Sequence, residues 1–297
     1  MQQHPVKAVI LITALLFQTI FVTAQQVKEP KLTHPEWAQN YQPYRIAGNL
    51  YYVGTYDLAS YLIVTAKGHI LINTGLASSE KQILDNIAAL GFKYSDIKIL
   101  LTTQAHYDHL GAMAAIKKKT KAKFWANAPE AAVLKTGGDS DYAFGGEGPS
   151  FKPVKADKFL KNGDSISLGG TTLVMLSHPG HTQGSCSYIF TTSDSARSYR
   201  VLIANMPTIV TSQHFDKIAL YPNIARDYAH TLKDLRLQQF DIWVASHAGQ
   251  FSMHEKHKPG DAYNPVAFAG RTGFDASLDE LQKDYDDKLK SDAAGNK

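Results

Sequence analysis

The chain has 297 residues, of which 44% are hydrophobic and 20% are charged, the proportions of an ordinary soluble globular protein. Its formal net charge is +4 at pH 7, and no basic stripe is interleaved with aromatic residues, so the sequence gives no sign of nucleic-acid binding. A chain of this length can bury a sizeable core without disulfides. Cys186 is the only cysteine, which excludes an internal disulfide, and its apolar surroundings predict a buried packing residue.

The N-terminus has the organisation of a secretory signal peptide. Lys7 precedes a nearly apolar stretch over residues 9–22, and Val22-Thr23-Ala24 offers the small residues that a signal peptidase reads. We expect cleavage after Ala24, so that residues 1–24 are a signal peptide and residues 25–297 form a single domain in the periplasm, with no membrane segment. A retained anchor is the alternative, but the stretch is short for a membrane span of about 20 residues.

Hydrophobic alternation and turn residues predict strands with interspersed helices along the whole chain. After an irregular arm over residues 25–45, the first half contains predicted strands at 50–53, 60–64, 69–72 and 97–101 and predicted helices at 79–90 and 110–119. Residues 136–153 are rich in Gly and Pro and form a predicted long loop of a kind that is often functional. The second half contains predicted strands near 154–160, 164–168, 171–177, 185–191, 199–204 and 240–245 and predicted helices at 226–238 and 277–290. This order predicts an α/β fold in which two sheets pack face to face under outer helices.

Three short segments carry side chains that suit a metal ion. His106, Asp108 and His109 lie within four residues, directly after the predicted strand at 97–101. His181 lies in a Gly- and Pro-containing turn between two predicted strands, and His247 follows another. Imidazole and carboxylate are ligands that zinc accepts readily. An isolated histidine more often has an ordinary structural role, so the argument depends on the three segments meeting in space.

Together these segments resemble the metallo-β-lactamase superfamily, whose signature is His-x-His-x-Asp-His, a Gly-His turn and a late histidine at a strand end. The resemblance covers most of the mature chain and implies a four-layer αββα sandwich with metals at one edge. The details are most similar to the third subclass of class B β-lactamases, and within it to the GOB-type enzymes. Three departures from the usual pattern support this: Gln104 replaces the leading His, Asn205-Met206 replaces a bridging Asp or a Cys, and Asn73 replaces an Asp.

The resemblance implies two zinc sites and a substrate. The first site would comprise Gln104, His106 and His181, and the second Asp108, His109 and His247. We expect one or two zinc ions per chain, the first site being weaker because a neutral amide oxygen is a poor zinc ligand. The implied activity is hydrolysis of the β-lactam amide of penicillins, cephalosporins and carbapenems, which confers antibiotic resistance. A zinc-bound hydroxide oriented by Asp108 would attack without a covalent acyl-enzyme, Thr208 would contact the substrate, and the protein would be a monomer.

Two alternatives stay open at this point. One is another hydrolase on the same fold, such as a lactonase or thioesterase, and the other is a periplasmic metal-binding or scaffold protein with a decayed site. Serine β-lactamase motifs occur only as scattered matches, such as Ser78 with Lys81, without an accompanying Ser-Asp-Asn. Four further histidines match no ligand spacing: we expect His178 behind the ligands or at the surface, and His214, His254 and His257 at the surface.

Overall fold

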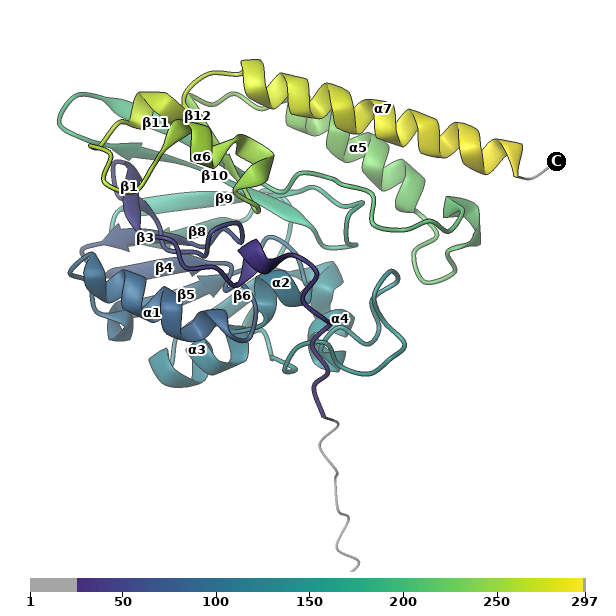
Figure 1. Cartoon of the computed structure of the whole chain (residues 1–297), viewed down its shortest axis with the longest axis horizontal. Coiled ribbons are helices and arrows are strands. Elements are labelled where there is room, and N and C mark those ends of the chain that lie inside the picture. The colour runs from purple at the N-terminus through teal and green to yellow at the C-terminus, as the bar shows by residue number, and fades with distance from the viewer. Residues whose placement is uncertain (1–25, 296–297) are drawn as a thin grey trace, which may run out of the picture.

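The computed structural model describes residues 26–295, and the predicted signal peptide lies outside them. Two β-sheets lie face to face, with α1 and α3 over one outer face and α5 and α7 over the other (Figure 1). The first sheet contains, in spatial order, β1 (Tyr44–Ala47), β2 (Leu50–Tyr52), β3 (Tyr61–Thr65), β4 (Gly68–Ile72), β5 (Ile97–Leu101), β6 (Lys123–Asn127) and β7 (Lys158–Leu160). The second contains β12 (Ile242–Ala245), β11 (Ser198–Ala204), β10 (Cys186–Ser193), β9 (Thr171–Ser177) and β8 (Ser165–Leu168). The helices are α1 (Ser79–Ala89), α2 (Tyr107–Leu110), α3 (Met113–Thr120), α4 (Ala131–Thr136), α5 (Ile224–Leu237), α6 (Met253–Lys256) and α7 (Thr272–Ala294).

The four layers confirm the predicted αββα sandwich, and the side-chain alternation of the strands explains it. Ile99 and Leu101 on β5 join the core cluster that includes residues of the second sheet, whereas Leu100 joins the cluster formed with α1 and α3. Successive side chains of a strand point to opposite faces, so the apolar run Ile99–Leu101 must be covered on both sides. Among residues 26–295, no helix combines the length and the hydropathy that a membrane span requires.

The parallel strands bring several chain segments to one edge of the sandwich. β4 and β5 pair in parallel in the first sheet, and β11 and β12 pair in parallel in the second. Asn73 follows β4, the segment from Thr102 follows β5, and Asn205 and Ser246 follow β11 and β12. The carboxyl ends of parallel strands meet at the same edge, where ligand sites of open α/β sheets are usually found.

Several predicted elements differ from the structure. The predicted helix at 110–119 is replaced by two shorter helices, α2 and α3, and Gly111 between them packs so closely on Leu76 and Ala77 that no side chain fits there. The predicted strand at 154–160 is reduced to β7, and the predicted arm ends earlier than expected because β1 begins at Tyr44. α4 and α6 have no counterpart in the predicted elements. The predicted loop over 136–153 contains neither helix nor strand after Thr136.

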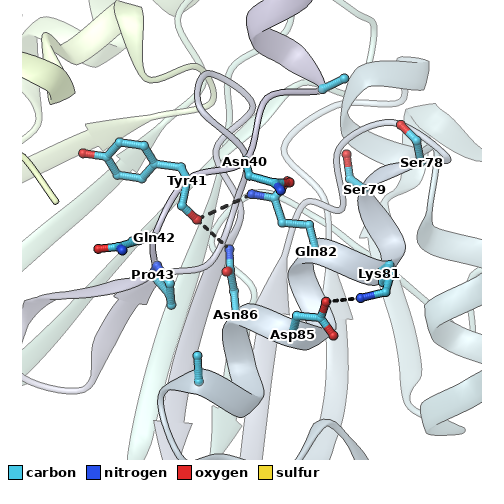
Figure 2. Close-up of a pocket in the computed structure, with 12 residues that line it drawn as sticks. Asn40, Tyr41, Gln42, Pro43, Ser78, Ser79, Lys81, Gln82, Asp85 and Asn86 are labelled. Atoms are coloured by element: carbon cyan, nitrogen blue, oxygen red, sulfur yellow. Dashed lines mark hydrogen bonds and ion pairs between the residues drawn. The ribbon is translucent and has the colours of Figure 1, made fainter.

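Side-chain hydrogen bonds from α1 hold the N-terminal arm. The side-chain amides of Gln82 and Asn86 donate to the carbonyl of Tyr41, at 3.5 and 3.2 Å, as Figure 2 shows. A cavity of about 580 Å³ lies between the arm and the helix, and it contains none of the predicted metal ligands. The attached arm carries a short 3-10 turn, Pro35–Trp37, whose Trp37 ring lies 5.6 Å from the ring of His247.

Candidate metal centre

The structure brings all three ligand-bearing segments together at the edge where the parallel strands end. Thr103 joins the two sheets there: its hydroxyl lies 2.9 Å from that of Ser246, and its carbonyl accepts from the backbone N–H of Cys186 at 2.8 Å. On the other side, Asn73 accepts the backbone N–H of Thr103 at 2.9 Å. Asn73 has a φ of 61°, a left-handed conformation that Asn tolerates better than most residues. The neutral amide that replaces the usual carboxylate therefore still supports the ligand-bearing turn.

Asp108, His109 and His247 form the first of two donor groups, which we call the carboxylate group. One ligand atom from each lies within 4.8 Å of the others. Asp108 Oδ2 is 3.2 Å from His109 Nε2 and 3.4 Å from His247 Nε2. Neither ring nitrogen of His109 has a hydrogen-bond partner among residues 26–295, although the side chain is almost fully buried. An unsatisfied buried nitrogen of this kind is costly unless a ligand binds it.

Electrostatics in the carboxylate group favour a charged carboxylate. Burial alone would raise the pKa of Asp108, but the neighbouring His109 and His247 hold it well below its usual range. Burial likewise opposes a charged His247, yet its hydrogen bonds with Asp108 and Asp57 raise its pKa to about 9. Positive charge is therefore favoured between these residues, which is the condition that a divalent cation also satisfies.

Asp57 supports the carboxylate group from behind. Its Oδ2 accepts from His247 Nδ1 at 2.9 Å, and its Oδ1 accepts from the backbone N–H of Gly249 at 3.0 Å. With Nδ1 held in this way, Nε2 on the opposite side of the His247 ring faces Asp108. A carboxylate behind a metal-binding histidine fixes both its tautomer and its ring orientation. Sequence reasoning missed Asp57 because it lies 190 residues from His247.

Gln104, His106 and His181 form the second donor group, which we call the amide group. His106 Nδ1 lies 3.2 Å from His181 Nε2 and 3.5 Å from Gln104 Nε2. His181 is held by Thr208, whose carbonyl and hydroxyl oxygens lie 2.8 and 3.0 Å from its Nδ1. Burial lowers the pKa of His181 to about 3, so its Nε2 keeps a free lone pair at neutral pH.

Gln104 is tied to Asn205 through its amide. Asn205 Nδ2 donates to Gln104 Oε1 at 2.6 Å, and the Gln104 NH₂ faces His106 Nδ1. The same Asn205 amide lies 3.3 Å from the Thr103 carbonyl, and the Asn205 backbone N–H donates to Ser187 Oγ at 2.9 Å. The side-chain oxygen that Gln104 can offer to a metal therefore already accepts one hydrogen bond.

His178 lies behind this network and is fully buried, which excludes the predicted surface position and leaves the predicted place behind the ligands. Its Nδ1 is 2.6 Å from Ser187 Oγ, and its Nε2 is 2.9 Å from Asp234 Oδ2. This array resembles a catalytic Ser-His-Asp set, but Ser187 has no exposed surface for a substrate. We interpret it as a support for Asn205.

Other sequence expectations have mixed outcomes. Cys186 is buried as predicted, and burial raises its thiol pKa to about 12. His257 is buried and stacks on Tyr44 with ring centroids 3.5 Å apart, so the predicted surface position is wrong. His254 is partly buried: its ring stacks on Tyr56 and meets the ring of Tyr41 in the N-terminal arm edge-on. The Thr208 hydroxyl faces His181, and its predicted contact with a substrate stays a prediction.

The donor set fits zinc in chemistry and in spacing. Two ligands bound at about 2.0–2.1 Å to a tetrahedral zinc ion are about 3.3 Å apart. Three of the six donor–donor pairs in the two groups, at 3.2, 3.4 and 3.2 Å, match this value. Nitrogen and carboxylate donors are the types that zinc prefers, and only Gln104 departs from them.

Comparison with known proteins agrees with this geometry. Residues 55–193 match the family model described as the metallo-beta-lactamase superfamily. Among curated proteins, the chain is 28% identical to a probable metallo-hydrolase from Burkholderia pseudomallei over 126 residues and 35% identical to a hydroxyacylglutathione hydrolase from Rhodopseudomonas palustris over 107 residues. These matches cover 41% and 35% of this chain and span only 40% and 33% of the two relatives.

Solved structures match over nearly the whole described chain. One is the class B3 di-zinc metallo-β-lactamase LRA-12 from an Alaskan soil metagenome, at 62% identity, a TM-score of 0.88, and coverage of 89% of this chain and 100% of that chain. Another is the metallo-β-lactamase GOB-18 from Elizabethkingia meningoseptica, at 57% identity, a TM-score of 0.89, and coverage of 91% and 100%. The predicted resemblance to the third subclass is confirmed, and the chain belongs to the class B3 metallo-β-lactamases.

Proposed function

We propose that this protein hydrolyses the amide bond of β-lactams, namely penicillins, cephalosporins and carbapenems, in a zinc-dependent reaction that confers antibiotic resistance. The observation that carries the proposal is the convergence of Asp108, His109 and His247 into one buried donor group beside His106 and His181. The similar class B3 enzymes, one of which is described as di-zinc, support both the metal and the substrate class.

In this proposal, the two donor groups each hold one zinc ion: Asp108, His109 and His247 hold one, and Gln104, His106 and His181 hold the other. Bound zinc polarises a carbonyl group and lowers the pKa of a coordinated water to about 7. The chain's own residues fix the site for this chemistry. Asp57 and Thr208 hold the Nδ1 sides of His247 and His181, so that both histidines present Nε2 to the centre.

Asp108 is the proposed catalytic residue. Its pKa lies well below the usual range, so it stays ionised at neutral pH and can accept a hydrogen bond from the attacking water. Since the reaction needs no nucleophilic side chain, no acyl-enzyme forms. Cys186, with its raised pKa and complete burial, supplies no nucleophile either. The hydroxyl of Thr208, at the half-buried rim of the site, is the proposed contact for the substrate.

The same proposal includes the location and form of the protein. We infer that residues 1–24 are a signal peptide, that residues 25–297 are exported to the periplasm as one domain, and that this domain acts as a monomer. The charged Lys7 and the apolar stretch after it support export. Expression of the full chain in a bacterium, followed by fractionation and N-terminal sequencing, tests this: a mature protein that begins at Gln25 in the periplasmic fraction is expected.

The main experiment measures hydrolysis of a carbapenem by the purified mature protein, together with a zinc count. We expect turnover that EDTA abolishes and that added zinc restores. A homoserine lactone and a glutathione thioester serve as comparison substrates for the two alternative hydrolase classes. Faster turnover of either one would make the protein a lactonase or thioesterase, and zinc binding without chelator-sensitive turnover of any substrate would make it a metal-binding protein.

A further inference from the structure

The loop that follows α4 is packed against the amide group and is held by its own hydrogen bonds. The Gly137 carbonyl accepts the backbone N–H groups of Ser150 and Phe151 at 2.8 and 3.0 Å. Asp139 Oδ1 accepts those of Gly146 and Gly148 at 3.2 and 2.7 Å. The backbone of this loop is therefore set before any ligand or substrate binds.

Asp141 in this loop faces a ligand of the amide group. Its Oδ1 accepts the backbone N–H groups of Ala143 and Phe144, both at 2.9 Å, which fixes the direction of the carboxylate. Its Oδ2 lies 3.4 Å from His106 Nε2, and both side chains are only 4% exposed. Asp141 is therefore the acidic neighbour of Nε2, which has no hydrogen-bond partner among residues 26–295.

The same loop contacts both histidines of the amide group. The Phe144 ring meets the His106 ring edge-on, with centroids 4.9 Å apart and planes at 75°. The Tyr142 hydroxyl donates to the carbonyls of Gly180 and His181, at 3.3 and 3.0 Å. Asp141, Tyr142 and Phe144 together hold the imidazole rings of His106 and His181 relative to each other.

The chemistry of imidazole gives Asp141 its role. A neutral histidine carries its proton on one ring nitrogen and its free lone pair on the other. His106 presents Nδ1 to His181 and Gln104, so Nδ1 can donate to a metal only when the proton resides on Nε2. A carboxylate beside Nε2 favours that tautomer and increases the donor strength of the opposite nitrogen.

We propose that Asp141 is a positioning residue that keeps the His106 proton on Nε2 and so supports zinc binding at the amide group, where Gln104 offers only a neutral amide. The inference rests on the zinc sites of the proposed function but not on the identity of the substrate. It gives the loop over 136–153 a function in metal binding that is separate from any contact with substrate.

The test is the zinc affinity of the Asp141→Asn protein. Asparagine retains Oδ1, which holds the loop, and replaces only the oxygen that faces His106. We expect the second zinc equivalent to bind about 10- to 100-fold more weakly by chelator competition, the size of effect that such supporting groups have. The first equivalent, bound by the carboxylate group, should change less than about twofold, since Asp141 does not contact that group.

Asp139→Asn is the matched control, because it makes the same charge change in the same loop and also retains its Oδ1. We expect it to bind both zinc equivalents like the wild type. Equal weakening by both variants, unchanged binding by Asp141→Asn, or uptake of a single zinc equivalent by the wild type would each overturn the inference. Because the readout is metal binding without substrate, a protein that binds two zinc ions but hydrolyses no β-lactam would contradict the proposed function and leave this inference standing.

Discussion

The two donor groups lie side by side at one edge of the sandwich but differ in their chemistry. The carboxylate group joins a charged Asp108 to two imidazoles, with Asp57 fixing His247 from behind. The amide group joins two imidazoles to the neutral Gln104, whose oxygen already accepts a hydrogen bond from Asn205. The first group has a negative charge for a cation to neutralise, whereas the second has none among its ligands.

This difference indicates that the two groups bind zinc in a fixed order. The charge of Asp108 and the donor types both favour the carboxylate group. In the amide group, the nearest negative charge comes from Asp141, which stands behind His106 instead of among the ligands. Variants that change one donor group at a time therefore test whether the two groups differ in this way.

The largest effect is expected for Asp108→Ala, which removes the only anionic ligand. Turnover of nitrocefin should fall at least about 1,000-fold, the factor that corresponds to about 4 kcal/mol of lost transition-state stabilisation. Zinc binding at the carboxylate group should weaken with it, as a chelator titration can show. Nitrocefin hydrolysis at the wild-type rate by purified Asp108→Ala protein would refute the role given to this residue.

The next largest effect is expected for Asp57→Asn. Asparagine keeps an oxygen for the Gly249 N–H but no longer offers a carboxylate to His247, so zinc at the carboxylate group should bind about 10- to 100-fold more weakly. Asp85→Asn is the control, because Asp85 is an exposed residue on α1 that pairs with Lys81 far from the ligands. If zinc affinity falls equally in both proteins, net charge and not the contact with His247 explains the loss.

Gln104→His should strengthen the weaker group. An imidazole in place of the amide supplies a nitrogen donor that zinc prefers, and we expect its affinity at the amide group to rise about tenfold, or about 1.4 kcal/mol. The same change removes the acceptor of Asn205, which should destabilise the zinc-free protein by about 1 kcal/mol. Chelator competition and thermal unfolding of the zinc-free protein measure the two effects. Unchanged zinc affinity would show that the amide is already an adequate ligand.

Local sequence patterns were sufficient to predict the layers of the fold and the candidate metal ligands. Strands such as β5 and β9 alternate or concentrate apolar residues, and ligands cluster where such strands end. β1 and α4 were missed because they are short and carry no such pattern. The break between α2 and α3 lies at Gly111, whose backbone packs closely on Leu76, a contact between distant segments that periodicity does not report.

The residues that support the ligands could not be predicted from the sequence, because their contacts also join distant segments. Asp57 and Asp141 support ligands that lie 190 and 35 residues away, so neither belongs to a motif with fixed spacing. Asn205 was noticed only as a substitution, and its bond to Gln104 depends on two strands from different sheets ending at one edge. A sequence can thus indicate which residues bind a metal before it indicates which residues hold those ligands in place.

The smallest effect is expected for Thr208→Val, which separates the two roles open to this residue. The backbone carbonyl of Thr208 lies closer to His181 Nδ1 than its hydroxyl does, at 2.8 against 3.0 Å, and a single N–H donates well to only one of them. Valine keeps the carbonyl, so zinc affinity at the amide group should not change. If the free hydroxyl binds the substrate, KM should rise about three- to tenfold, as expected for one lost hydrogen bond of about 1 kcal/mol. A fall in zinc affinity with an unchanged KM would instead assign the hydroxyl to His181 and remove Thr208 from the substrate contacts.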